Sequence, residues 1–253
     1  MKTIKHVAIG TEVMIPVSGE HVDLVLSSPL FQRWTKSISR SLKVKSILIQ
    51  SADVIRREGR EYVLFIKLQA EIFSSEGRKL PGVIFLRGDA VGILVVLEDE
   101  NKQSHIVLVK GSMPALGDAF YLQMPAGMTD GQNNIRAVAI REGKEETGIN
   151  FEDGGELFNL GNLLCLPGAN RGLLGLSASP GACDEKIHLF VYRKKVSRDF
   201  INSLDGRITG LPGDLEHLKL KVIRFEDLPL ETYDMKTLLA YFMYGQALHR
   251  GLL

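Results

Sequence analysis

The chain of 253 residues is long enough for one large domain or two small ones. It is 45% hydrophobic and 24% charged, as globular proteins commonly are. A net charge of +1 argues against a nucleic-acid partner, and no apolar run reaches the roughly 20 residues that span a bilayer. Two cysteines are too few for a disulfide scaffold, and the N-terminus lacks the apolar core of a secretory signal. We therefore expect a cytoplasmic protein without membrane partners. The alternative location is an organelle.

The first third of the chain predicts a helix followed by a small sheet. Residues Ser27–Leu42 carry apolar side chains near helical spacing behind an opening Ser-Pro pair. From Val44 the apolar period changes to two, which is typical of strands. The expected strands are Ser46–Val54, Tyr62–Phe73 and Val83–Leu86. We expect residues 1–87 to form a small antiparallel, β-rich N-terminal domain.

The remaining residues, 88–253, are expected to form the second domain. It opens with the apolar strands Ala90–Leu97, His105–Lys110 and Ala119–Met124. The last of these strands runs directly into Pro125-Ala126-Gly127. A glycine turn after a strand can direct a backbone carbonyl at a cation. The carbonyl of Ala126 is therefore a candidate metal ligand.

The next segment predicts a helix that carries a cluster of carboxylates. Asn133 is expected to cap its N-terminus and Gly148 to end it. Glu142, Glu145 and Glu146 stand at i, i+3 and i+4, so they share one side of the helix. Clustered carboxylates repel one another unless a positive charge lies among them, and Mg²⁺ prefers such oxygen ligands. The alternative is a solvated helix face screened by neighbouring cations.

The stretch from Gly127 to Ile149 resembles the Nudix box, Gly-x5-Glu-x7-Arg-Glu-U-x-Glu-Glu-x-Gly-U, where U is a bulky aliphatic residue. The matching positions are Gly127, Arg141, Glu142, Glu145, Glu146, Gly148 and Ile149. Asn133 stands where the family has its first Glu, and Gly143 where it has an aliphatic residue. The resemblance implies a Nudix α/β/α sandwich with a mixed sheet, preceded by the β-rich domain.

A loop at residues 167–185 follows, between the expected strands Leu157–Leu166 and Lys186–Val196. It ends in a Ser-Pro-Gly…Glu pattern that includes Pro180, Gly181 and Glu185. This pattern resembles an element of the ADP-ribose and ADP-sugar branch of the Nudix family. The resemblance implies that Pro180 and Gly181 bind substrate, and the alternative is an ordinary Gly/Pro turn.

A second loop, at residues 209–217, precedes the expected strand Leu218–Phe225, and a closing helix is expected at Met235–Arg250. ADP-sugar-type relatives carry an acidic residue near the metals in this loop. Glu216 falls on that position and is the candidate general base, with Asp214 and Glu185 as alternatives.

The resemblance as a whole implies metal-dependent hydrolysis of an ADP-sugar, such as ADP-ribose or ADP-glucose, to AMP and a sugar phosphate. The cation, Mg²⁺ or Mn²⁺, would be held by Glu142, Glu145, Glu146 and the carbonyl of Ala126. Glu145 and Glu216 would act in catalysis together with Arg141, which would orient the glutamates.

The resemblance also implies a homodimer through the N-terminal domain. Arg87 is a candidate phosphate contact, and an aromatic ring of the partner, Trp34 or Phe31, is a candidate to stack on adenine. For Trp34 the alternative is simple packing. Two other functions stay open. One is a Nudix hydrolase of another nucleoside diphosphate derivative, such as a dinucleotide, a cofactor or a GDP-sugar, and the other is a non-catalytic ADP-ribose sensor.

Overall fold

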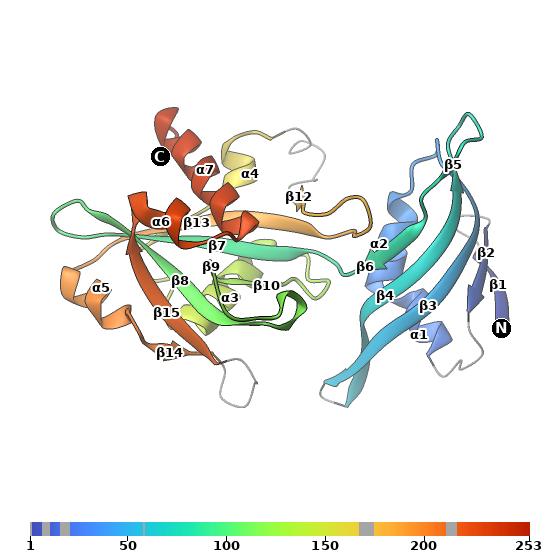
Figure 1. Ribbon diagram of the computed structural model, residues 1–253, viewed down its shortest axis with the longest axis horizontal. Helices are drawn as coiled ribbons and strands as arrows, with labels where there is room; N and C mark the ends of the chain where they lie inside the picture. The colour runs from blue at the N-terminus through green and yellow to red at the C-terminus, as the bar shows by residue number, and fades with distance from the viewer. Residues whose placement is uncertain (1, 7–10, 16–20, 58, 167–174, 211–216) are drawn as a thin grey trace. The chain divides into compact units, whose positions relative to one another are not determined.

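A computed structural model describes residues 2–6, 11–15, 21–57, 59–166, 175–210 and 217–253. The chain divides into two compact units (Figure 1). The N-terminal unit comprises Met1–Asp89 and Ser177–Lys186, and the C-terminal unit comprises Ala90–Leu176 and Ile187–Leu253. The expected domain limits, 1–87 and 88–253, stay a prediction.

The N-terminal unit contains a sheet with the strand order β1-β2-β3-β4-β5, in which β6 also pairs with β4. Its strands are β1 Lys2–His6, β2 Thr11–Ile15, β3 Lys43–Arg57, β4 Arg60–Phe73, β5 Lys79–Leu80 and β6 Val83–Leu86. All these pairings are antiparallel except the short one between β2 and β3, which is parallel. The expected antiparallel pairing is confirmed for β3, β4, β5 and β6.

Two helices, α1 Val22–Ser27 and α2 Pro29–Ser37, cover one face of this sheet and enclose its apolar core. The side chain of Ser28 caps α2 by accepting from the amide of Phe31. The predicted helix extended to Leu42, but α2 ends at Ser37. Ser39 explains part of the difference, because its side-chain oxygen accepts from Ser41 N at 3.2 Å in a turn that competes with the helix.

The C-terminal unit contains a mixed sheet with the strand order β11-β13-β7-β8-β15-β14, and β9, β10 and β12 pair at its margins. The strands are β7 Ala90–Glu98, β8 Ser104–Met113, β9 Asp118–Gln123, β10 Ala126–Met128, β11 Glu156–Asn159, β12 Leu176–Ser177, β13 Lys186–Lys195, β14 Ile208–Thr209 and β15 Leu218–Arg224. β13 runs parallel to β7, whereas β8 runs antiparallel to it.

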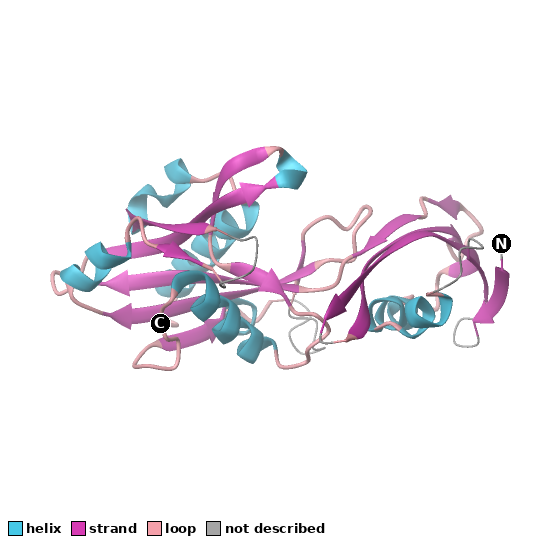
Figure 2. Ribbon diagram, turned by 90° about the horizontal axis from the view of Figure 1, so that it is seen from below, coloured by secondary structure: helices cyan, strands magenta, loops and turns pink. Residues whose placement is uncertain are grey.

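Helices lie on both faces of this sheet (Figure 2). They are α3 Ile135–Thr147, α4 Leu160–Leu163, α5 Arg198–Leu204, α6 Leu228–Glu231 and α7 Met235–His249, with 3₁₀ turns at Pro114–Leu116 and Phe225–Asp227. Alternate residues of β7 explain this arrangement. Val91, Ile93 and Val95 share a core with α3 and α5, while α7 also packs on β7 and residues such as Leu94 on its other face are fully buried. The α/β/α sandwich with a mixed sheet is confirmed.

One predicted strand of this unit needs correction. The segment Leu157–Leu166 is not one strand, because β11 ends at Asn159 and the helix α4 begins at Leu160. The side chain of Asn159 accepts from Asn162 N at 2.9 Å and so caps this short helix. In the part of the chain that the structure describes, no helix is long and apolar enough to cross a membrane.

Candidate active site

The backbone that leaves β9 is fixed between β7 and the helix α3. The carbonyl of Pro125 accepts from Ile93 N at 2.9 Å, and Ala126 pairs with Gly92 of β7. The amide of Ala126 donates to Oε2 of Glu146 at 3.0 Å. The structure therefore brings two of the predicted metal ligands, Ala126 and Glu146, into direct contact.

The second glutamate of the helix lies against Gly127. A Cβ atom on Gly127 would lie 2.1 Å from Cδ of Glu142 and 2.2 Å from its Oε2, so any other residue here would displace this carboxylate from its present position. The side chain of Glu142 is 13% exposed. The glycine at the start of the box and the first glutamate of the helix are thus in close contact.

The helix α3 begins one residue later than predicted. Its N-cap is Asn134, whose side chain accepts from Ala137 N at 3.1 Å, and not Asn133, which is exposed. At the other end the prediction is confirmed, since Gly148 adopts the left-handed conformation with φ 69° and its amide donates to Lys144 O.

The departure from the family pattern at Gly143 has a structural explanation. A Cβ atom on Gly143 would lie 2.6 Å from Cζ of Phe151 and 2.9 Å from both Cε atoms of the ring. Phe151 is 3% exposed and stacks on Tyr192 with ring centroids 4.2 Å apart. The space that an aliphatic side chain would occupy on the helix is therefore filled by an aromatic ring from the following loop.

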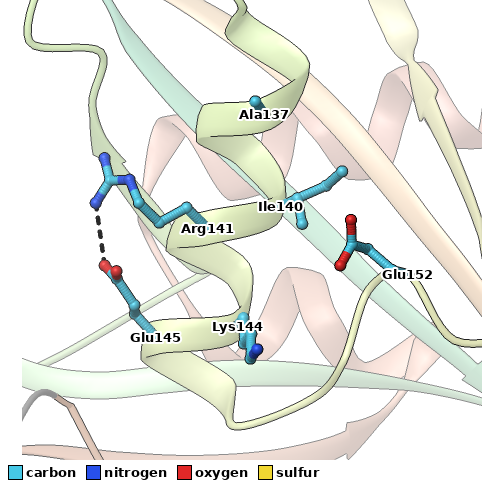
Figure 3. A pocket seen from close by; sticks show the side chains of 6 residues that line it. All are labelled: Ala137, Ile140, Arg141, Lys144, Glu145 and Glu152. Atoms are coloured by element: carbon cyan, nitrogen blue, oxygen red, sulfur yellow. Dashed lines mark hydrogen bonds and ion pairs between the residues drawn. The ribbon is translucent and has the colours of Figure 1, made fainter.

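Arg141 joins two of the three carboxylates. Its Nη2 lies 2.6 Å from Oε1 of Glu142, and its Nη1 lies 3.1 Å from Oε2 of Glu145. Figure 3 shows Arg141 and Glu145 one turn apart along α3, at the margin of an open pocket of about 620 Å³. Glu152, in the loop after the helix, also lines this pocket.

Burial raises the pKa of the Glu142 carboxyl above its usual range. The carboxylates of Glu145 and Asp130 raise it further, whereas the guanidinium of Arg141 acts in the opposite direction. A partly desolvated carboxyl among other acids gains most when a cation binds beside it. The electrostatics of Glu142 therefore fit a cation-binding role.

Within the described residues, no three Asp, Glu, His or Cys side chains converge closely enough to hold a metal ion. Arg141 takes one oxygen from each of Glu142 and Glu145, and the Ala126 amide takes one from Glu146. The remaining donors are carboxylate and carbonyl oxygens, which suit a hard cation such as Mg²⁺. The donor chemistry therefore fits such a cation.

One candidate substrate residue, Arg87, lies in a polar cluster of the N-terminal unit. Nε of Arg87 lies 3.3 Å from Oε1 of Glu185, and the amides of Arg87 and Gly88 donate to Oδ1 of Asp184 at 2.7 and 3.2 Å. Arg33 of α2 also pairs with Asp184, at 3.3 Å. Sequence reasoning missed Arg33 and Asp184. Asp184 adjoins the Ser-Pro-Gly…Glu pattern, while nothing in the sequence of α2 marks Arg33.

The other candidate residues have different surroundings. Pro180 and Gly181 are exposed. Trp34 is partly buried and packs against the core of the N-terminal unit. Phe31 belongs to that core and is 0% exposed, so the suggestion that its ring stacks on adenine is wrong, because neither face of the ring is available.

Glu216 and its alternative Asp214 lie outside the described residues, but the ends of their loop are placed. Thr209 in β14 pairs with Leu218 in β15. The hydroxyl of Thr209 donates to the carbonyl of Glu146 at 2.5 Å. Thr209 therefore lies beside the last turn of α3.

A mixed sheet covered by helices, with a glycine turn leading to a carboxylate-bearing helix, defines the Nudix class of folds. Residues 86–241 match the family model described as the NUDIX domain, and the chain belongs to the Nudix hydrolase family. It is 31% identical over 237 residues to a protein of Arabidopsis thaliana described as "Nudix hydrolase 14, chloroplastic", covering 90% of this chain and 73% of that protein.

A solved structure described as "Crystal structure of ADP compounds hydrolase" superposes with a TM-score of 0.50. The alignment covers 83% of this chain and 98% of that one, with 18% sequence identity. At this identity the likeness supports the fold alone.

Proposed function

We propose that this Nudix hydrolase cleaves the diphosphate of an ADP-sugar, ADP-ribose or ADP-glucose, to AMP and a sugar phosphate, with Mg²⁺ or Mn²⁺ as its cation. The observation that carries the proposal is the packing of Glu142 against Gly127 beside the contact between Glu146 and the Ala126 amide. These contacts bring two carboxylates of one helix, those of Glu142 and Glu146, to a single backbone turn, in a family whose hydrolases generally use divalent metals.

The residues that would hold the cation are Glu142, Glu145, Glu146 and the carbonyl of Ala126. When bound, the cation neutralises charge that develops on the diphosphate and lowers the pKa of a water molecule. Arg141 holds one oxygen each of Glu142 and Glu145 through its ion pairs, and it would thereby set the orientation of both carboxylates toward the cation. Arg141 is thus an orienting residue.

The base that takes the proton of the attacking water is proposed to be Glu216. The carboxylates of α3 are committed to the cation, so a base must come from another element. The loop of Glu216 begins at Thr209, which is bound to the carbonyl of Glu146, and this anchoring supports the assignment. Asp214 and Glu185 remain the alternatives.

The substrate class rests on the Ser-Pro-Gly…Glu pattern, whose Glu185 is paired with Arg87. A structural relative described as a hydrolase of ADP compounds supports this substrate class. Binding of substrate by Arg87, Trp34, Pro180 and Gly181 stays a prediction. The cellular location also stays a prediction, the cytoplasm, with an organelle open because the relative from Arabidopsis thaliana is described as chloroplastic.

The test is release of nucleoside monophosphate by the purified protein with Mg²⁺ and then Mn²⁺. ADP-ribose and ADP-glucose are the expected substrates, and a GDP-sugar and a dinucleotide are the comparators. AMP should appear only with metal, so equal rates with and without EDTA would overturn the metal mechanism. Faster cleavage of the comparators would redirect the substrate class, and binding of ADP-ribose without AMP release would identify a sensor.

A further inference from the structure

A buried hydrogen-bond network joins the start of α7 to β9. The hydroxyl of Tyr121 donates to Oδ1 of Asp234 at 2.9 Å, and Nζ of Lys236 donates to the same oxygen at 2.7 Å. The hydroxyl of Thr237 donates to Oδ2 of Asp234 at 2.6 Å. Asp234 is 3% exposed and Thr237 is 0% exposed, so this polar cluster lies inside the protein.

Asp234 is held in its ionised form. Burial opposes ionisation, but the charge of Lys236 and the hydrogen bonds from Lys236 and Thr237 outweigh it, and the pKa of Asp234 lies below its usual range. A carboxylate can only accept hydrogen bonds. The proton of the Thr237 hydroxyl is therefore committed to Asp234.

This commitment leaves a lone pair of the Thr237 hydroxyl for the backbone. Met124 N donates to Oγ1 of Thr237 at 2.8 Å. Met124 is fully buried and lies just beyond the last residue of β9. Two residues further on is Ala126, whose amide binds Glu146 and whose carbonyl is the proposed ligand. Thr237 therefore connects α7 to the backbone segment that supplies the metal site.

The hydrogen bond from the Met124 amide to the Thr237 hydroxyl is not needed to cap α7. Asp234 already caps α7 by accepting from the amide of Thr237 at 2.9 Å. A valine at position 237 would keep that amide and nearly the same volume, yet it would leave the Met124 amide without its partner. The hydroxyl thus has a specific effect on the backbone ahead of Ala126.

We propose that Thr237 and Asp234 are positioning residues of the metal site, which fix the peptide of Met124 and through it the direction of the Ala126 carbonyl. The inference rests on the proposed function, because it takes that carbonyl as a ligand. Groups that orient metal ligands typically change metal affinity about 10- to 100-fold when they are removed. Thr237→Val should weaken metal binding by a factor in that range.

The experiment measures Mn²⁺ binding to the full-length protein without substrate, by the loss of the free-ion signal in electron paramagnetic resonance. Thr237→Ser keeps the hydroxyl and should bind Mn²⁺ nearly as the wild type does. Ser197→Ala removes the cap of α5, which accepts from Phe200 N at 3.2 Å, and serves as a control for lost helix capping. Its Mn²⁺ affinity should be unchanged.

Thermal melting of each variant establishes that it is folded. If Thr237→Val does not fold, Thr237→Ala takes its place, since alanine also removes the hydroxyl that accepts from the Met124 amide. Mn²⁺ affinity of the folded variant equal to wild type, or an equal loss in Ser197→Ala, would overturn the positioning role alone. Failure of the wild-type protein to bind Mn²⁺ would overturn the proposed metal site and this inference with it.

Discussion

Replacing Gly143 by alanine tests the packing beneath the carboxylate helix. Helix propensity alone predicts that alanine stabilises an interior helical position by about 1 kcal/mol relative to glycine. The structure predicts the reverse, because the new Cβ atom would lie 2.6 Å from Cζ of Phe151. That ring cannot move away freely, since it is buried and stacked on Tyr192.

The expected magnitude follows from these opposing effects. Extra volume in a packed core typically costs about 1–3 kcal/mol. After the gain in propensity, Gly143→Ala should lower the free energy of unfolding by up to about 2 kcal/mol. In a Phe151→Leu background the clash is relieved, and the same substitution should become stabilising.

Urea unfolding of the metal-free protein measures both effects. Gly245 in α7 provides the matched control, because a Cβ atom there meets nothing within 4 Å. Gly245→Ala should raise stability by about 1 kcal/mol. If Gly143→Ala stabilised the protein as much as Gly245→Ala does, the proposed clash with Phe151 would be refuted.

The other predictions concern the site, the assembly and pH. Glu142→Gln and Glu146→Gln should each lower kcat far more than they alter the melting temperature, and near wild-type turnover at saturating metal would contradict the ligand assignment. Glu216→Gln should lose about 10²- to 10⁴-fold in kcat with little change in substrate binding; a loss under tenfold would move the role elsewhere. Light scattering at micromolar concentration should give twice the 28.0 kDa of one chain, because residues 44–87 are too few to bury a large core alone, and a monomer would refute the dimer. The pKa of Asp234 is lower in the folded protein than its value near 3.8 in the unfolded chain. Its carboxylate therefore stabilises the fold above that pH, and this stabilisation is lost as the pH falls through the pKa of the folded state. Asp234→Asn should flatten the loss of stability below about pH 4 in urea titrations, and an unchanged acid limb would contradict its pairing with Lys236.

The sequence alone established the parts of the site that depend on neighbouring residues. The spacing of Glu142, Glu145 and Glu146 places them along one side of a helix because the helical repeat is local. Gly148 ends that helix because glycine adopts the left-handed conformation without strain. The apolar strands of the mixed sheet were also recognisable, since β7 is buried along nearly its whole length and reads as a continuous apolar run.

Tertiary structure decided which distant residues meet. The segment that carries the Ser-Pro-Gly…Glu pattern belongs to the N-terminal unit. There the backbone of Cys183 forms an isolated β-bridge with Phe85, and the carboxylate of Asp184 accepts from Arg87 N. No local rule indicates these contacts, because their partners lie about a hundred residues away in the chain.

The same reason explains Gly143 and Thr237. In the sequence, Gly143 is a weak helix former and Thr237 an ordinary helical residue. In the fold, Gly143 receives the ring of Phe151, and Thr237 accepts the Met124 amide from 113 residues away. Close packing around a buried ring and the need to pair a buried amide exist only once the chain has folded, so the roles of these residues could not be predicted from local pattern.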